Sequence, residues 1–104
     1  MTDQIKYNQI PAITLNDVGK RMTHGHKKHG DYRKRMMELP RFHYLDHLLW
    51  HIEQFYDIKK RKLKDNPELF TGSGDSHALA IACDAMIFYE SEKERGMLQI
   101  KEEQ

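Results

Sequence analysis

The chain of 104 residues is long enough for one domain with a modest hydrophobic core, and we expect no second domain. Seventeen Lys and Arg residues against sixteen Asp and Glu leave a net charge of +1, so no overall field attracts nucleic acid or an anionic membrane. The N-terminal stretch lacks a secretion signal, and no apolar run is long enough to span a membrane. A single cysteine excludes an internal disulfide. We therefore expect a cytoplasmic protein with no membrane partner and no nucleic-acid partner.

The first half of the chain predicts an extended arm and two helices. Residues 1–12 are polar and suit an arm. Thr14 or Asn16 is expected to cap a helix with apolar side chains at helical spacing, which fades near Gly30. A second, short helix is expected over residues 31–39, because the proline that follows disfavours the α conformation in the residue before it.

The longest predicted helix begins after Pro40 and ends near Lys62. At about 100° per residue its large apolar side chains fall within an arc of roughly 120°, which is typical of a helix packed against a core. These side chains are Leu45, Leu48, Leu49, Ile52, Phe55 and Tyr56. The cationic run of residues 59–64 suits the negative end of the helix dipole, and it lacks the aromatic residues that would stack on bases.

The last helix follows a loop over residues 66–75 that is rich in Gly and Pro. Ser73, Asp75 or Ser76 is expected to cap this helix, which extends to about Arg95. The remaining residues, 97–104, are predicted to be a frayed tail.

No strand pattern is visible, so the predicted fold is all-α. We expect a small helical bundle built on an antiparallel pair of long helices, with one nucleotide-binding domain over residues 13–96. The last helix is apolar on every side and cannot bury itself against one partner helix, which predicts a homo-oligomer.

Polar residues interrupt the apolar faces of both long helices. Asp84 lies in the middle of the last helix among apolar neighbours, and a buried carboxylate is costly unless something pairs with it. His77 lies two turns earlier on the same line. On the long helix Asp46 and Glu53 share one edge of the apolar stripe, and His51 lies at its other edge.

If the two helices pack antiparallel, Asp46 or Glu53 approaches Asp84 or His77. Carboxylates and an imidazole would then form a ligand set for Mg²⁺ or Mn²⁺. Alternatives stay open: Glu53 as an exposed or salt-bridged residue, His77 as a partner of the loop, and Asp84 as half of an ion pair at an oligomer interface.

Three of the seven histidines fall within residues 24–30. His26 and His29 can share a transition metal, but the usual spacings of zinc ligands are absent. Lys27 and Lys28, flanked by glycines, are interpreted as a mobile turn with two cations suited to phosphates, and a solvated basic turn is the alternative.

Three short motifs stand in chain order: a Gly-x-Lys-Lys-x-Gly turn at residues 25–30, an Asp-x-x-x-x-His helix from Asp46 to His51, and a Ser-Gly-x-x-His segment from Ser73 to His77 that leads into the helix of Asp84. Together they resemble the dATP/dGTP diphosphohydrolase N-terminal family, which is largely phage-encoded. The resemblance implies an all-α fold akin to the MazG-like nucleoside triphosphate pyrophosphohydrolases, which hold Mg²⁺ on acidic helix residues and cleave between the α and β phosphates.

Two functions are therefore considered. The first is a (deoxy)nucleoside triphosphate pyrophosphohydrolase that needs Mg²⁺ or Mn²⁺. Its metal ligands would be Asp46, Glu53 and Asp84, and its catalytic residues would be His51 and His77. The nucleotide would be bound by Lys27, Lys28, Tyr44 and Trp50. The second is a non-catalytic sponge that needs no cofactor and sequesters a nucleotide immune signal, cyclic or derived from ADP-ribose.

Overall fold

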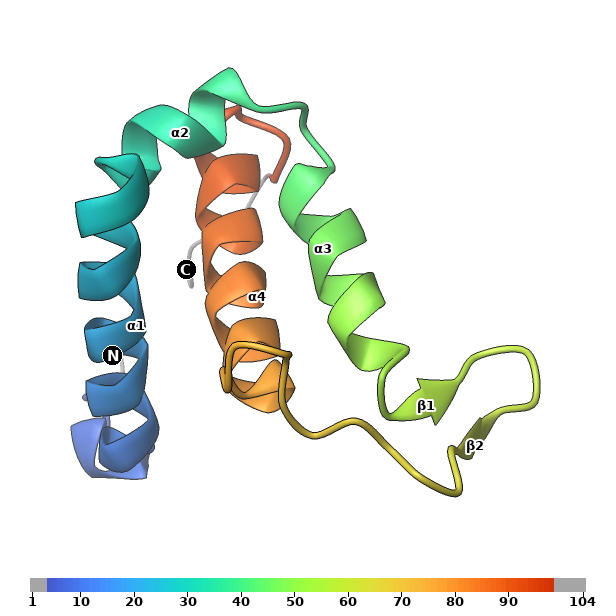
Figure 1. The fold of residues 1–104 in the computed structure, drawn as a ribbon. Helices are drawn as coiled ribbons and strands as arrows, with labels where there is room; N and C mark the ends of the chain where they lie inside the picture. Colours follow the sequence, from blue (N-terminus) through green and yellow to red (C-terminus); the bar gives the residue numbers. More distant parts are fainter. Residues whose placement is uncertain (1–3, 99–104) are drawn as a thin grey trace.

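The computed structural model describes residues 4–98, which form four α-helices and a small two-stranded sheet (Figure 1). The helices are α1 (Ala12–His29), α2 (Tyr32–Glu38), α3 (His43–Ile52) and α4 (His77–Glu94). A short 3₁₀ turn, η1 (Tyr7–Gln9), precedes α1, and the strands β1 (Tyr56–Asp57) and β2 (Lys62–Leu63) lie between α3 and α4. This mostly helical fold agrees broadly with the predicted all-α class, apart from the strands.

The first two helices occupy the predicted segments. α1 begins at Ala12, before the expected cap at Thr14 or Asn16. Gly30 follows its last residue as the C-cap, and the φ of 83° at this position suits glycine. The side chain of Asp31 caps α2 by accepting a hydrogen bond from the Arg33 N–H. The structure corrects one expectation: residues 27–28 lie in the last turn of α1 and not in a mobile turn.

The predicted long helix is wrong beyond Ile52. α3 has 10 residues, and the chain then turns back in an antiparallel hairpin that pairs Tyr56 with Leu63. In its turn the Asp57 carboxylate accepts a hydrogen bond from the Lys60 N–H, and Arg61 has a φ of 53°. The cationic run therefore belongs to a hairpin and not to a helix end.

α4 lies between α1 and α3, with α2 across one end (Figure 1). Ser76 caps it by accepting a hydrogen bond from the Leu79 N–H, so one of the three predicted caps is confirmed. The buried side chains of the described residues are apolar and polar in equal number: Val18, Met36, Ala80, Cys83 and Ile87, against His51, His77, Asp84, Ser91 and Glu92. The core is small, and its polar half needs partners.

Two arginines hold the ends of the helices together. Arg41, just before α3, donates from Nε to both carboxylate oxygens of the buried Glu92, at 3.0 and 3.1 Å. Arg95 donates from Nη2 to the carbonyls of Met36 and Leu39, both at 2.9 Å. These contacts join the end of α2 and the segment before α3 to the C-terminal end of α4.

Arg41→Ala is expected to lower the free energy of unfolding by about 1–3 kcal/mol, because it leaves the buried Glu92 carboxylate without its partner. Lys34→Ala is the control: its ion pair with Glu38 is long, at 3.9 Å, and exposed, so a loss below about 0.5 kcal/mol is expected. Urea unfolding of both variants measures the difference. Equal losses in the two variants would contradict the assignment.

Candidate functional site

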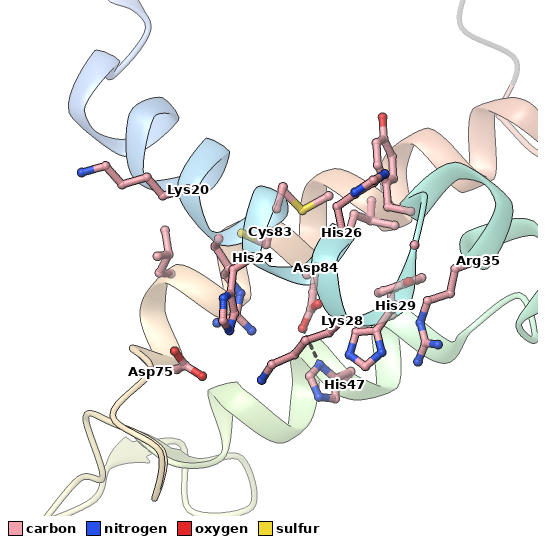
Figure 2. A pocket seen from close by; sticks show the side chains of 18 of the residues that line it. Lys20, His24, His26, Lys28, His29, Arg35, His47, Asp75, Cys83 and Asp84 are labelled. Carbon is pink, nitrogen blue, oxygen red and sulfur yellow. Dashed lines mark hydrogen bonds and ion pairs between the residues drawn. The ribbon is translucent and has the colours of Figure 1, made fainter.

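A cleft of about 630 Å³ opens between α1, α2, α3 and the N-terminal half of α4 (Figure 2). This volume is within the range of sites that hold a small molecule of nucleotide size. Side chains from all four helices line the cleft, and Figure 2 shows cationic and imidazole groups around a space that also contains Asp84.

α1 supplies a basic wall to the cleft. Lys20, Arg21, His24 and Lys28 all line it, and their spacing places them on one face of the helix. Arg35 of α2 adds another cation. These four Lys and Arg side chains outnumber the three aspartates that line the same cleft, Asp17, Asp75 and Asp84, so the balance of charge around it is positive.

Asp84 lies on the opposite side of the cleft and is paired. His47 Nδ1 and Asp84 Oδ2 are 2.7 Å apart, as the dashed line in Figure 2 marks. Burial raises the pKa of the Asp84 carboxyl, and the hydrogen bond from His47 and the charge of Arg21 act against this rise. The buried carboxylate therefore has its partner within the same chain, in α3.

Two further imidazoles, those of His51 and His77, lie behind the pair of His47 and Asp84. The Nδ1 atoms of His51 and His77 are 2.7 Å apart, so one ring donates and the other accepts. Both side chains are buried, and the Trp50 ring packs edge-on against them, with centroids 4.8 and 5.5 Å away. His51 Nε2 has no hydrogen-bond partner in the described structure and lies 4.0 Å from Asp84 Oδ2.

His51 is a neutral imidazole at pH 7. Burial lowers its pKa to about 4, and the neighbouring charges of His47, His77 and Arg21 act in the same direction. The free Nε2 atom of His51 thus faces Asp84 from a ring that carries no charge.

His47, His51 and Asp84 each offer one donor atom, and these three atoms lie within 4.8 Å of one another. Such a group can hold a metal ion. His47 was missed from the sequence, although a signal was present: His43, His47 and His51 recur every four residues and so share one face of α3.

The structure brings some of the predicted site residues together. Asp84, His51 and His77 come together between α3 and α4, and Lys28 and Tyr44 line the cleft. Burial raises the pKa of the Tyr44 hydroxyl, which remains neutral.

The other predicted residues lie elsewhere. Asp46 and Glu53 are exposed and are not members of the His47 group in the described structure; His47 occupies the place beside Asp84 that Asp46 was expected to take. Lys27 borders a separate, shallower hollow on α1. Trp50 does not line the cleft; its ring packs against the buried His51 and His77 and also stacks on His47, which does line it.

Acidification is expected to destabilise the protein because of His51. Its folded pKa of about 4 is below the unfolded value of 6.5, so the unfolded state binds more protons between these values and stability falls as the pH falls. At pH 5 the loss relative to pH 7 is about 2 kcal/mol. Denaturant unfolding with a chelator present measures this loss.

His51→Gln should remove this loss, whereas His24→Gln, which changes an exposed imidazole, should keep it. The raised pKa of Asp84 has the opposite sign and adds stability at the acidic end, so the difference between the two variants isolates His51. Identical pH profiles for the two variants would contradict the assignment.

Comparison with known proteins identifies one family. The family model described as dATP/dGTP diphosphohydrolase, N-terminal, matches residues 1–101, which confirms the resemblance inferred from the motifs. No curated protein and no solved structure matches the chain. Within the residues that the structure describes, none of the helices is long and apolar enough to cross a membrane.

Proposed function

This chain belongs to the dATP/dGTP diphosphohydrolase N-terminal family, and on that premise we propose that its cleft binds a purine deoxynucleoside triphosphate and hydrolyses it to the monophosphate and pyrophosphate. One observation carries the proposal: a basic wall and a buried carboxylate line the same cavity. Cations neutralise the phosphates, and the carboxylate is the group that a catalytic metal ion requires.

The basic wall fits a triphosphate. Lys20 and Lys28 on α1 act as point charges, while Arg21 and Arg35 present planar guanidinium groups that bind phosphate oxygens in a bidentate manner. These four cations match the three to four negative charges expected for a triphosphate at about pH 7. Tyr44 lies at the same cleft, and we keep it as the candidate for stacking on the base.

A divalent cation completes this proposal. Mg²⁺ is usually held by one or two carboxylates together with substrate phosphates, so Asp84 at a phosphate-binding cleft fits Mg²⁺ that enters with the nucleotide, and Mn²⁺ can also use the nearby imidazoles. When bound, the ion would neutralise phosphate charge and activate a water molecule. We assign no metal ligand to the exposed Asp46 and Glu53.

The histidines position the site in this proposal. His77 holds the ring of His51 through their 2.7 Å contact, and His47 holds the Asp84 carboxylate through its Nδ1. A pKa of about 4 makes His51 a weak base at pH 7, so it is better suited to hold a partner than to abstract a proton.

A sponge is the second candidate function. Asp84 is the one carboxylate of the group with His47 and His51, whereas phosphoryl-transfer sites often use several acidic ligands. A basic wall that faces a single buried carboxylate also suits binding without turnover, for which no cofactor is needed.

Product analysis separates the two functions. The purified protein is incubated with dATP, dGTP and cyclic or ADP-ribose-derived nucleotides in the presence of Mg²⁺ or Mn²⁺, the unbound fraction is removed, and both fractions are analysed by mass spectrometry after denaturation. Monophosphate and pyrophosphate in solution support the hydrolase. An intact nucleotide that is released only on denaturation supports the sponge, and no retained or altered nucleotide rejects both.

We further propose that the protein is a homo-oligomer. Met86 and Tyr89 are 50% and 51% exposed on α4, and they border an apolar hollow of about 460 Å³ together with Val18 and Met22 of α1. Contact between copies would bury this surface. Analytical ultracentrifugation should show an oligomer that Met86→Glu dissociates, and a monomeric wild-type protein would contradict the proposal.

A further inference from the structure

We propose that His47, His51 and Asp84 form a binding site for a transition-metal dication such as Co²⁺ or Zn²⁺, and that the protein without nucleotide prefers such an ion to Mg²⁺. The proposed function requires only an ion that enters with the nucleotide. Here the ion belongs to the protein itself, and its binding does not depend on hydrolysis.

The chemistry of the donors favours this class of ion. The group offers two imidazoles and one carboxylate, from α3 and α4, with donor atoms within 4.8 Å of one another. Imidazole is a good ligand for Co²⁺ and Zn²⁺, whereas the harder Mn²⁺ binds a site of this kind more weakly than Co²⁺ does. Mg²⁺ prefers oxygen ligands in near-ideal octahedral geometry, which one carboxylate and two imidazoles do not supply.

An unpaired buried nitrogen is the second, independent observation. His51 is 2% exposed, and its Nε2 atom has no hydrogen-bond partner in the described structure. A buried polar group without a partner destabilises the folded state. An ion at this point would give Nε2 the partner that it lacks.

The distances within the group suit a shared ion. His51 Nε2 and Asp84 Oδ2 are 4.0 Å apart, which is too far for a hydrogen bond. Two donors that each lie about 2.1 Å from one ion are roughly 3–4 Å apart, so a small movement would let both bind. His47 Nδ1 lies 2.7 Å from Asp84 Oδ2, and the ion would replace the proton that they share.

His77 supplies the orientation that metal-binding histidines need. Such histidines usually engage their other ring nitrogen in a hydrogen bond, which fixes the ring and the tautomer. His51 Nδ1 contacts His77 Nδ1 at 2.7 Å, and when His51 donates in this bond its Nε2 carries the free lone pair toward Asp84. His77 is thus a positioning residue for the site.

The site is also accessible to ions. The His47 side chain is 46% exposed and lines the cleft, with Asp84 directly behind it (Figure 2). An ion can therefore enter from solvent without unfolding the helices, and it would lie at the surface where the proposed function places the triphosphate.

Direct metal titration tests the inference without nucleotide. The protein is freed of metal with a chelator, then titrated with Co²⁺ while the visible absorption of the ion is recorded, and the bound metal per chain is counted by elemental mass spectrometry. We expect one Co²⁺ per chain with a new absorption band, and we expect a tenfold molar excess of Mg²⁺ over Co²⁺ to leave the band unchanged.

Matched variants identify the ligands. His51→Gln is expected to weaken Co²⁺ binding at least about 100-fold, and His47→Gln, at a half-exposed position that tolerates change, serves if the first variant fails to fold. His29→Gln, which changes a histidine of the same cleft outside the group, should bind like the wild type.

Co²⁺ binding that both ligand variants leave unchanged, displacement of Co²⁺ by that excess of Mg²⁺, or the absence of stoichiometric Co²⁺ binding would each overturn the inference. The proposed function is judged separately by the nucleotide products, so either proposal can fail while the other holds.

Discussion

Asp84→Asn is expected to reduce metal-dependent hydrolysis of dGTP at least about 100-fold, which corresponds to about 2.7 kcal/mol of lost transition-state stabilisation. Asparagine has nearly the same shape but no charge, so it cannot neutralise a cation next to the phosphates. Release of pyrophosphate, followed with saturating dGTP and Mg²⁺ or Mn²⁺, measures the effect on kcat.

The fold should survive this substitution. Burial already raises the pKa of the Asp84 carboxyl, so a neutral group at this position removes a desolvation cost and unfolding should need at least as much denaturant as for the wild type. A loss of activity would then report on the chemistry and not on folding.

Asp46→Asn is the matched control, because Asp46 is an exposed carboxylate of the helix that faces Asp84. Activity close to that of the wild type is expected. Should Asp46→Asn abolish turnover as Asp84→Asn does, the metal-ligand role predicted for Asp46 from the sequence would be right, and its exclusion from the site would be wrong.

Lys28→Ala is expected to weaken binding of a triphosphate by about 1.5–3 kcal/mol, roughly 10- to 100-fold in Kd, because one charge-assisted contact with a phosphate is lost. Lys28 lines the cleft together with several histidines (Figure 2). Calorimetry with a dGTP analogue that has a methylene group between the α and β phosphates gives the affinity without turnover.

Lys27→Ala provides the comparison, since Lys27 is the next residue of α1 and borders a different hollow. Its affinity should equal that of the wild type, and both variants change the net charge by the same amount. Equal weakening in the two variants would show a diffuse electrostatic effect and would remove Lys28 from the site.

Local signals in the sequence were sufficient for most helix boundaries. The cap at Ser76, the glycine at residue 30 and the proline at residue 40 act within one helical turn, so their consequences can be inferred without tertiary structure. The end of α3 depends on more distant contacts: the N–H of Lys64 donates to the Phe55 carbonyl at 2.8 Å. Aromatic and β-branched side chains in this segment suit a strand as well as a helix, and hairpin pairing decides between them.

The candidate site could be predicted only in part. A carboxylate in an apolar helix predicts a partner, and Asp84 has one, but the sequence does not say whether an acid or an imidazole faces it. That choice depends on the rotation of α3 against α4. The spacing of Lys20, Arg21 and Lys28 is enough to place them on one face of α1, but only the fold shows that this face lines a cavity and that Arg35 of α2 joins it.

The central claim, that the triphosphate binds in the cleft between α1, α3 and α4, is tested most directly by NMR titration of ¹⁵N-labelled protein with the methylene analogue of dGTP. We predict that the shifted amide signals belong to residues 20–35 of α1 and α2, residues 43–47 of α3 and residues 75–87 around the start of α4. Shifts confined to the hairpin of residues 56–63 would contradict the account.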